Sequence, residues 1–175
     1  MAITPHNLDG YGMPAIEWDR VQQTMAIDLP QAPGTGGPSR HTAWLTTMDS
    51  DGAPHVRPVG IQRYEGAWYF NSSPDAHKAR NIAKDARCSV SLATDPFDLV
   101  VEGTASRVTD VDELAAVAAV FVEGGWPASV VGDALTAEFS APSAGKPPYY
   151  VYRVDPTRVY AFGTAEPFGA TRFDL

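Results

Sequence analysis

The sequence predicts a mainly β fold with a few helices, of the α+β class, in which antiparallel strands form a closed or partly closed barrel. Short apolar runs alternate with turn residues along most of the chain, and the first three runs are joined by connections too short for parallel crossovers. The 175 residues are 44% hydrophobic and 19% charged, which is typical of a globular domain. We expect residues 40–175 to form the barrel and residues 1–39 to pack on it within one structural domain.

The N-terminal region is expected to contain one amphipathic helix and a linker. Trp18, Val21 and Met25 recur at helical spacing, so a helix is predicted over residues 14–29. Residues 30–39 are too rich in proline and glycine for regular structure and are predicted to be a linker.

Seven short strands follow, separated by turn residues such as those of the Asp49-Ser50-Asp51-Gly52 run. Their expected ranges are His41–Met48, Ala53–Tyr64, Ala67–Phe70, Cys88–Thr94, Asp98–Val108, Tyr149–Asp155 and Thr157–Gly163. The last two strands are expected to be joined by a turn at Asp155-Pro156. Residues 126–148 are expected to be irregular.

Two further helices interrupt the strands. The first is predicted over residues 74–85, with Ser73 as its N-terminal cap. The second is predicted over residues 109–123, where Thr109 and Asp112 resemble a capping box and a glycine pair ends the helix.

Composition narrows the function classes. The net charge of −8 argues against a general nucleic-acid binder, because phosphate binding requires a basic surface. Cys88 is the single cysteine, so an intramolecular disulfide is excluded and a reducing compartment is expected. No apolar run approaches transmembrane length, and the N-terminus lacks a basic segment followed by an apolar one, so we expect a cytoplasmic protein without a membrane partner.

Several familiar motifs are incomplete in this chain. The turn at Asp49 begins like a calcium loop, but its glycine comes too early and its twelfth position is Gly60. The four histidines show no metal-ligand spacing, so no metal site is predicted; they are His6, His41, His55 and His77. Cys88 lies in an apolar strand and is expected to be a core residue rather than a nucleophile.

One stretch has the composition of an anion site. In FNSSPDAHKARNIAKD, residues 70–85, hydroxyl groups and a helix start are followed by Lys78, Arg80 and Lys84. Free N–H groups at a helix N-terminus, together with cations, bind anions well. The alternative is that these cations only solvate a surface helix.

A second stretch has the pattern of a strand surface open to a ligand. In HVRPVGIQ, residues 55–62, Pro58 removes a ladder donor and Gly60 allows close approach to the backbone. The alternative is an edge or bulge in which Arg57 faces water. Together the two stretches indicate a surface for a flat ligand, with a phosphate-sized anion at the next helix.

These two stretches lie within a longer run that resembles a known protein family. The run TTMDSDGAPHVRPVGIQRYEGAWYFNSSPDAHKARNIAKDARCSVSLATD resembles the flavin- and deazaflavin-binding split-barrel proteins, the pyridoxamine 5'-phosphate oxidase-like superfamily. The likeness covers about residues 40–108 and continues more loosely through residues 149–163 to residues 170–173. Actinobacterial members that use the deazaflavin coenzyme F420 are the most similar. The resemblance implies a six-stranded split barrel and a homodimer with two cofactor sites at the subunit interface.

The resemblance also implies which residues bind the cofactor. The segment along the isoalloxazine ring and ribityl chain contributes Arg57, Pro58, Val59, Gly60 and Gln62, and the following strand contributes Phe70, Asn71, Ser72 and Ser73. Lys78 is implied as the phosphate ligand. His77 stands where many relatives carry a second basic residue, and Arg80 is a candidate substitute for it.

The expected function is an oxidoreductase that transfers a hydride between bound FMN or F420, with a lean to F420, and an unidentified small molecule. The C-terminus lacks the Arg-x-His pair that grips pyridoxal phosphate in the true oxidase, so pyridoxamine 5'-phosphate is not the expected substrate. No catalytic acid or base is identified. The alternatives are a non-catalytic protein that binds or scavenges a cofactor or tetrapyrrole, and a flavin-free structural dimer.

Overall fold

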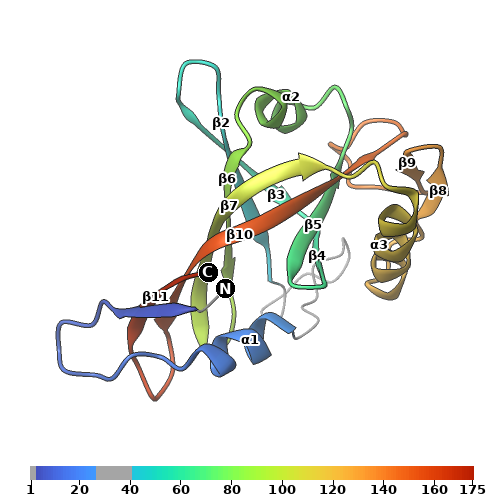
Figure 1. Ribbon diagram of the computed structural model, residues 1–175. Coiled ribbons are helices and arrows are strands. Elements are labelled where there is room, and N and C mark those ends of the chain that lie inside the picture. The colour runs from blue at the N-terminus through green and yellow to red at the C-terminus, as the bar shows by residue number, and fades with distance from the viewer. Residues whose placement is uncertain (1–2, 27–40) are drawn as a thin grey trace.

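The computed structural model describes residues 3–26 and 41–175, which form a β-rich α+β fold (Figure 1). The predicted fold class is therefore confirmed. The helices are α1 (Trp18–Ala26), α2 (His77–Lys84) and α3 (Val111–Glu123). The strands are β1 (Thr4–Asn7), β2 (Ala43–Met48), β3 (Pro54–Val59), β4 (Ile61–Tyr64), β5 (Ala67–Ser72), β6 (Arg87–Ala93), β7 (Phe97–Arg107), β8 (Ser129–Val131), β9 (Ala134–Thr136), β10 (Tyr150–Gly163) and β11 (Ala170–Asp174).

One large antiparallel sheet holds nine of the described strands. Its order is β1-β11-β10-β7-β6-β2-β3, with β5 paired to the first part of β10 and β4 paired to β5. The 14-residue strand β10 crosses the molecule in Figure 1 and joins three neighbours, because β5 and β11 share one of its edges while β7 lines the other.

The strand predicted over Ala53–Tyr64 is wrong in extent, because the structure divides it at Gly60. The part before Gly60 pairs with β2, and the part after it pairs with β5. Pro58 has no N–H for a further ladder, and it lies on β3, which has a neighbour on one edge alone. The chain therefore leaves one ladder and enters another at this point.

The two strands predicted on either side of Asp155-Pro156 are one strand, β10. Its register with β7 shifts between Pro156 and Arg158, so Pro156 marks a bulge rather than a turn. Gly103 on β7 leaves room for the bulge because it has no side chain. A Cβ at that position would lie 2.2 Å from the Asp155 carbonyl oxygen and would clash with it.

Both predicted helix caps are wrong. α2 begins at His77 after Ala76, which provides no side-chain cap, and Ser73 lies in the preceding turn, where its Oγ accepts from the Asp75 N–H at 3.4 Å. Asp110 rather than Thr109 caps α3, since its Oδ1 accepts from the N–H groups of residues 112 and 113 at 3.1 and 2.9 Å.

The N- and C-terminal strands and one hairpin were not predicted. The exposed strand β1 pairs with β11, and the β8–β9 hairpin lies within the stretch expected to be irregular. None of the three short segments (β1, β8 and β9) shows a clear apolar alternation. Helix α1 confirms the predicted N-terminal helix over part of its length, whereas residues 27–40, including the predicted linker, lie outside the described residues.

β5 separates two hydrophobic cores. Phe70 is fully buried on one side with residues of β2, β7 and α1, and Tyr69 is buried on the other side with Leu114, Val117 and Phe121 of α3. Burial, followed by the hydrogen bond that its hydroxyl donates to Glu113 at 2.8 Å, raises the pKa of Tyr69 to about 12. Among the described residues, no helix is long and apolar enough to cross a membrane.

We predict that Gly103→Ala destabilises the protein by about 1–3 kcal/mol, because the added methyl group would force β7 and β10 apart. Urea unfolding measures the change. Gly10→Ala is the matched control, since no atom lies within 4 Å of its added Cβ, and its effect is expected to stay within about 0.5 kcal/mol. Equal stability of the two variants would contradict the close packing at the bulge.

We also predict that Asp110→Ala costs about 1 kcal/mol of unfolding free energy, because two backbone N–H groups of α3 lose their acceptor. Thr109→Ala is expected to change stability by less than about 0.5 kcal/mol. Thermal unfolding of both variants distinguishes the two caps, and the reverse order of effects would restore Thr109 as the capping residue.

Candidate functional site

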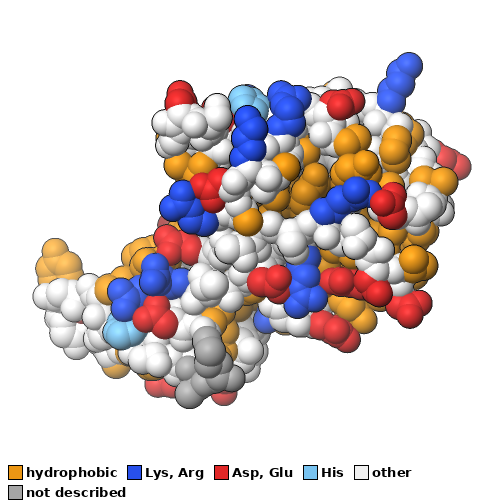
Figure 2. Space-filling view, turned by 45° about the horizontal axis from the view of Figure 1, so that its top comes forward, with side chains coloured by type: hydrophobic (Ala, Val, Ile, Leu, Met, Phe, Trp, Pro, Cys, Tyr) orange, Lys and Arg blue, Asp and Glu red, His pale blue; other side chains and the backbone are white. Residues whose placement is uncertain are grey.

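Basic side chains gather where the edge strand β3 meets the start of α2. Figure 2 shows Lys and Arg side chains beside a histidine at the top of the molecule, the end at which α2 lies in Figure 1. His55 and Arg57 lie on the same face of β3, because side chains alternate along a strand. Lys78 on α2 is half-buried, and its pKa is lowered first by burial and then by the charge of Arg57.

The two cations Arg57 and Lys78 have no carboxylate partner among the described residues. Arg57 donates from Nη1 to the Val56 carbonyl at 2.8 Å, and neither cation forms an ion pair within residues 3–26 and 41–175. Lys78 is half-buried and Arg57 is exposed; the charge of Arg57 acts on Lys78, and a bound anion would reduce the repulsion between the two cations. The arrangement is compatible with a phosphate-sized anion.

The serines predicted for the site lie at the end of β5, directly before α2. Ser72 is buried and donates from Oγ to the Ser73 carbonyl at 3.3 Å, while Ser73 is half-exposed. Asn71 is also half-exposed, opposite Val151 on β10. Phe70 is fully buried and stacks on Tyr152 at 5.2 Å between ring centroids, and β5 is paired on both edges at this position, so Phe70 exposes no group to a ligand.

The residues from Pro58 to Gln62 differ in how exposed they are and in what they pack against. Pro58 and Gly60 are exposed, and the space around Gly60 is open, with no atom within 4 Å of a Cβ built there. Val59 is half-buried against the main core. Gln62 instead packs against the end of α3, where its Nε2 would lie 2.2 Å from a Cβ on Gly124. The side chain of Gln62 therefore lies at α3 rather than beside Arg57.

Arg80 is directed to a different place from Lys78. The two residues are about 200° apart around α2, and Arg80 donates to the Asp75 carbonyl. It lines a hollow of about 380 Å³ between α2 and the β7–β10 pair, together with Arg107, whose guanidinium lies 3.4 Å from the Tyr150 ring centroid. This placement gives no support to Arg80 as the substitute for the second phosphate ligand.

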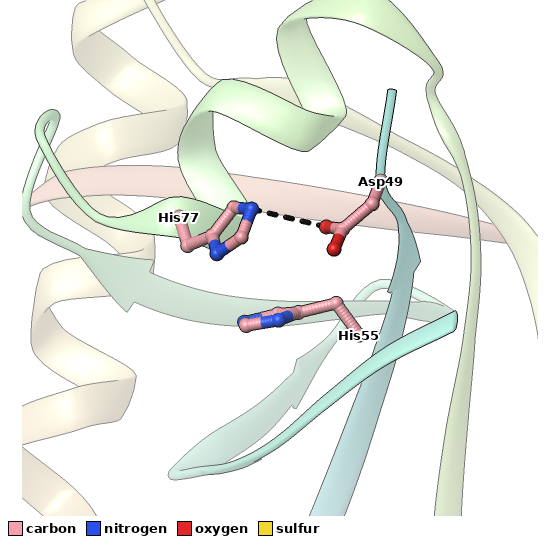
Figure 3. Close-up of side chains that lie close together, drawn as sticks. All are labelled: Asp49, His55 and His77. Carbon is pink, nitrogen blue, oxygen red and sulfur yellow. Dashed lines mark ion pairs between the residues drawn. The ribbon is translucent and has the colours of Figure 1, made fainter. Parts of the chain in front are cut away.

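The structure also brings together three residues that spacing in the sequence did not connect. His77 Nε2 lies 3.0 Å from Asp49 Oδ1, and the His55 ring lies 4.2 Å from the His77 ring between centroids (Figure 3). The turn after β2, the strand β3 and the start of α2 each contribute one of them. No local pattern predicts this group, because the three residues meet through tertiary contacts alone.

No nucleophile is evident among the described residues of this region. Burial raises the pKa of the Cys88 thiol to about 12, so the thiol is protonated at neutral pH, in agreement with the core role predicted for it.

Known proteins that resemble this chain give the context of the site. The family model described as Pyridoxamine 5'-phosphate oxidase matches residues 37–163. No curated protein matches the chain. Solved structures with a similar fold include an FMN binding protein, a heme binding protein and a protein of unknown function.

The FMN binding protein is a pyridoxamine 5'-phosphate oxidase-related protein from Nostoc punctiforme, 17% identical, with a TM-score of 0.50 and with 72% of this chain and 77% of that chain covered. The heme binding protein is from Mycobacterium smegmatis and is 21% identical, with a TM-score of 0.55 and 74% and 52% covered. The protein of unknown function is from Agrobacterium tumefaciens and is 21% identical, with a TM-score of 0.55 and 83% and 57% covered. At these identities the structures share the fold alone.

The family match rests on the sequence itself, whereas the similar solved structures share only the fold. It extends over well more than half of the chain and includes residues 55–62 and 70–85, the two stretches that form the basic site. The chain belongs to the pyridoxamine 5'-phosphate oxidase family.

Proposed function

We propose that the protein is an oxidoreductase that transfers a hydride between bound FMN or F420 and a small-molecule substrate. The single observation that carries the proposal is the pair of cations, Arg57 and Lys78, that lack a carboxylate partner among the described residues at the junction of β3 and α2. The family resemblance assigns the cofactor phosphate to Lys78. FMN and F420 share that phosphate, and our lean to F420 rests on the resemblance to actinobacterial members.

The residues around this pair fit a cofactor with a flat ring and a phosphate. Lys78 and the hydroxyl of Ser73 would hold the phosphate, and Arg57 would stabilise negative charge on the polar edge of the ring. The exposed backbone at Pro58 and Gly60 offers open space for the ring. When bound, such a ring supplies the hydride chemistry, and the protein orients and desolvates it.

Pyridoxamine 5'-phosphate is not the proposed substrate. Arg172, near the C-terminus, lies on β11 opposite His6 of β1 and pairs through Nη2 with Asp174 Oδ2 at 3.2 Å. Its guanidinium is thus occupied by a carboxylate within the sheet, and no histidine follows it at the spacing that the oxidase uses.

We further propose that the functional unit is a homodimer with the cofactor at the subunit interface. Trp44 and Val56 are 47% and 43% exposed on the outer face of the β2–β3 pair, and Pro58 lies opposite Trp44 on the same face. Exposed apolar side chains on an edge strand are typical of a surface that another chain covers. A second copy on this face would cover β3, the strand that carries Arg57 on its opposite face.

We predict that Lys78→Ala and Arg57→Ala each weaken cofactor binding by roughly 10- to 100-fold, the loss expected for a charge-assisted hydrogen bond. The measurement is a fluorescence titration of untagged protein with FMN and, separately, with F420. Lys84→Ala is the matched control, because it removes a lysine from the last turn of the same helix and is expected to leave binding unchanged.

Two outcomes would contradict this assignment. If neither cofactor binds the wild-type protein, the oxidoreductase proposal fails, and a parallel titration with haem then tests the tetrapyrrole-binding alternative. If Lys78→Ala binds as tightly as wild type, the phosphate lies elsewhere.

We also predict that Trp44→Glu converts the dimer to a monomer, because a carboxylate would be buried without a partner at the proposed interface. Light scattering coupled to size-exclusion chromatography measures the mass. Val122→Glu on α3 is the control, since Val122 is 50% exposed and lies away from β2. A monomeric wild-type protein would rule out the interfacial site.

A further inference from the structure

The fold places two imidazoles and a carboxylate around one point. Asp49 follows β2 directly, His55 lies on β3, and His77 is the first residue of α2. One ligand atom from each lies within 4.8 Å of the other two. Figure 3 shows His77 and Asp49 pointing toward each other, with the His55 ring lying below both.

From this arrangement we infer that Asp49, His55 and His77 form a binding site for a divalent transition-metal ion such as Zn²⁺. Imidazole nitrogens with one carboxylate oxygen are a donor set that zinc and its neighbours in the first row prefer, whereas calcium and magnesium prefer oxygen ligands. Three protein ligands leave a fourth position for water or an anion.

The Asp49 carboxylate is held in place by the amide of a neighbouring asparagine, which is a poorer ligand for a transition-metal ion than the carboxylate. Asn81, one turn beyond His77 on α2, donates from Nδ2 to Asp49 Oδ1 at 2.7 Å and to Thr47 Oγ1 at 3.1 Å. The contacts that the structure records for the Asp49 carboxylate are made by Oδ1, so Oδ2 remains available to an ion. Hydrogen bonds of this kind orient metal ligands and tune their affinity.

The His55 ring has no hydrogen bond that would compete with a metal ion. The residue is only 9% exposed, and the described part of the chain gives its ring no hydrogen-bond partner. An imidazole nitrogen is therefore left to coordinate an ion, and it is a ligand that Zn²⁺ prefers.

An ordinary histidine–carboxylate ion pair is the competing explanation, and the chain contains one for comparison. His6 Nε2 lies 2.9 Å from Asp174 Oδ2 at the opposite end of the strand order, without a second imidazole from the described residues beside it. Near Asp49, by contrast, there are two histidine rings, and the ion pair with the carboxylate engages His77 and leaves His55 without one. A metal ion would satisfy both.

The nearby cations limit how tightly an ion is held. Arg57 and Lys78 both act electrostatically on His55, and their positive charges oppose that of a divalent ion. We therefore expect binding weaker than that of a structural zinc site with four ligands.

The test is a calorimetric titration of the full, untagged chain with Zn²⁺ in the absence of any cofactor. Wild type is expected to bind one ion per chain, and His77→Gln and Asp49→Asn are each expected to weaken binding by about tenfold or more. His77 is exposed and both replacements are similar in size to the native residue, so the fold is expected to survive; circular dichroism checks it. Absorption of bound Co²⁺ reports the ligand set independently.

His6→Gln is the matched control, because it removes a histidine from the pair that lacks a second ring, and its Zn²⁺ affinity is expected to equal that of wild type. The inference is overturned if wild type binds no ion, if His77→Gln binds as tightly as wild type, or if His6→Gln loses as much affinity as His77→Gln. Since no cofactor is present, these outcomes are independent of whether FMN or F420 binds.

Discussion

The structure depends on the three-way pairing of β10. This strand hydrogen-bonds to β5, β7 and β11, so it joins the part of the sheet that carries α3 to the part that carries β1. The pairing survives the missing N–H of Pro156 because the strand bulges there and Gly103 gives the Asp155 carbonyl room. β5 in turn is buried on both faces, with Phe70 in one core and Tyr69 in the other. The long strand β10 therefore links the strands that enclose the two hydrophobic cores.

That framework determines where the basic site lies. β5 pairs with β10 and ends at Ser72, and the chain then turns into α2, which packs on β2 through the hydrogen bonds of Asn81 to Thr47 and Asp49. The break at Gly60 leaves β3 at the edge of the sheet. The start of α2 and the exposed edge strand consequently meet, and Lys78 approaches Arg57 although the two residues are far apart in the sequence.

The cations at this junction differ from the arginines of β7 and β10. The chain is acidic, and the arginines on β7 and β10 have carboxylate partners: Arg107 pairs with Asp133, Arg153 with Glu113, and Arg158 with Glu102. Exposed pairs of this kind contribute little stability, but they do neutralise each cation locally. Arg57 and Lys78 lack such neutralisation among the described residues, and the nearby acid Asp49 is engaged by His77 and Asn81. The anion site that we propose lies at this junction.

The sequence by itself determined the fold class, the helix predicted over residues 109–123 apart from its first two residues, most of the strands and the family, because these follow from local periodicity, turn chemistry and a contiguous motif. It also indicated Arg57 and Lys78, since both lie within that motif. Only the tertiary structure decided that Arg80 and Gln62 lie apart from Arg57 and Lys78, that the chain changes ladders at Gly60, and that His55, His77 and Asp49 lie close together. The reason is physical: alternation along a strand or helix tells which side chains share a face, whereas the partner that each face meets is set by pairings between segments far apart in the chain.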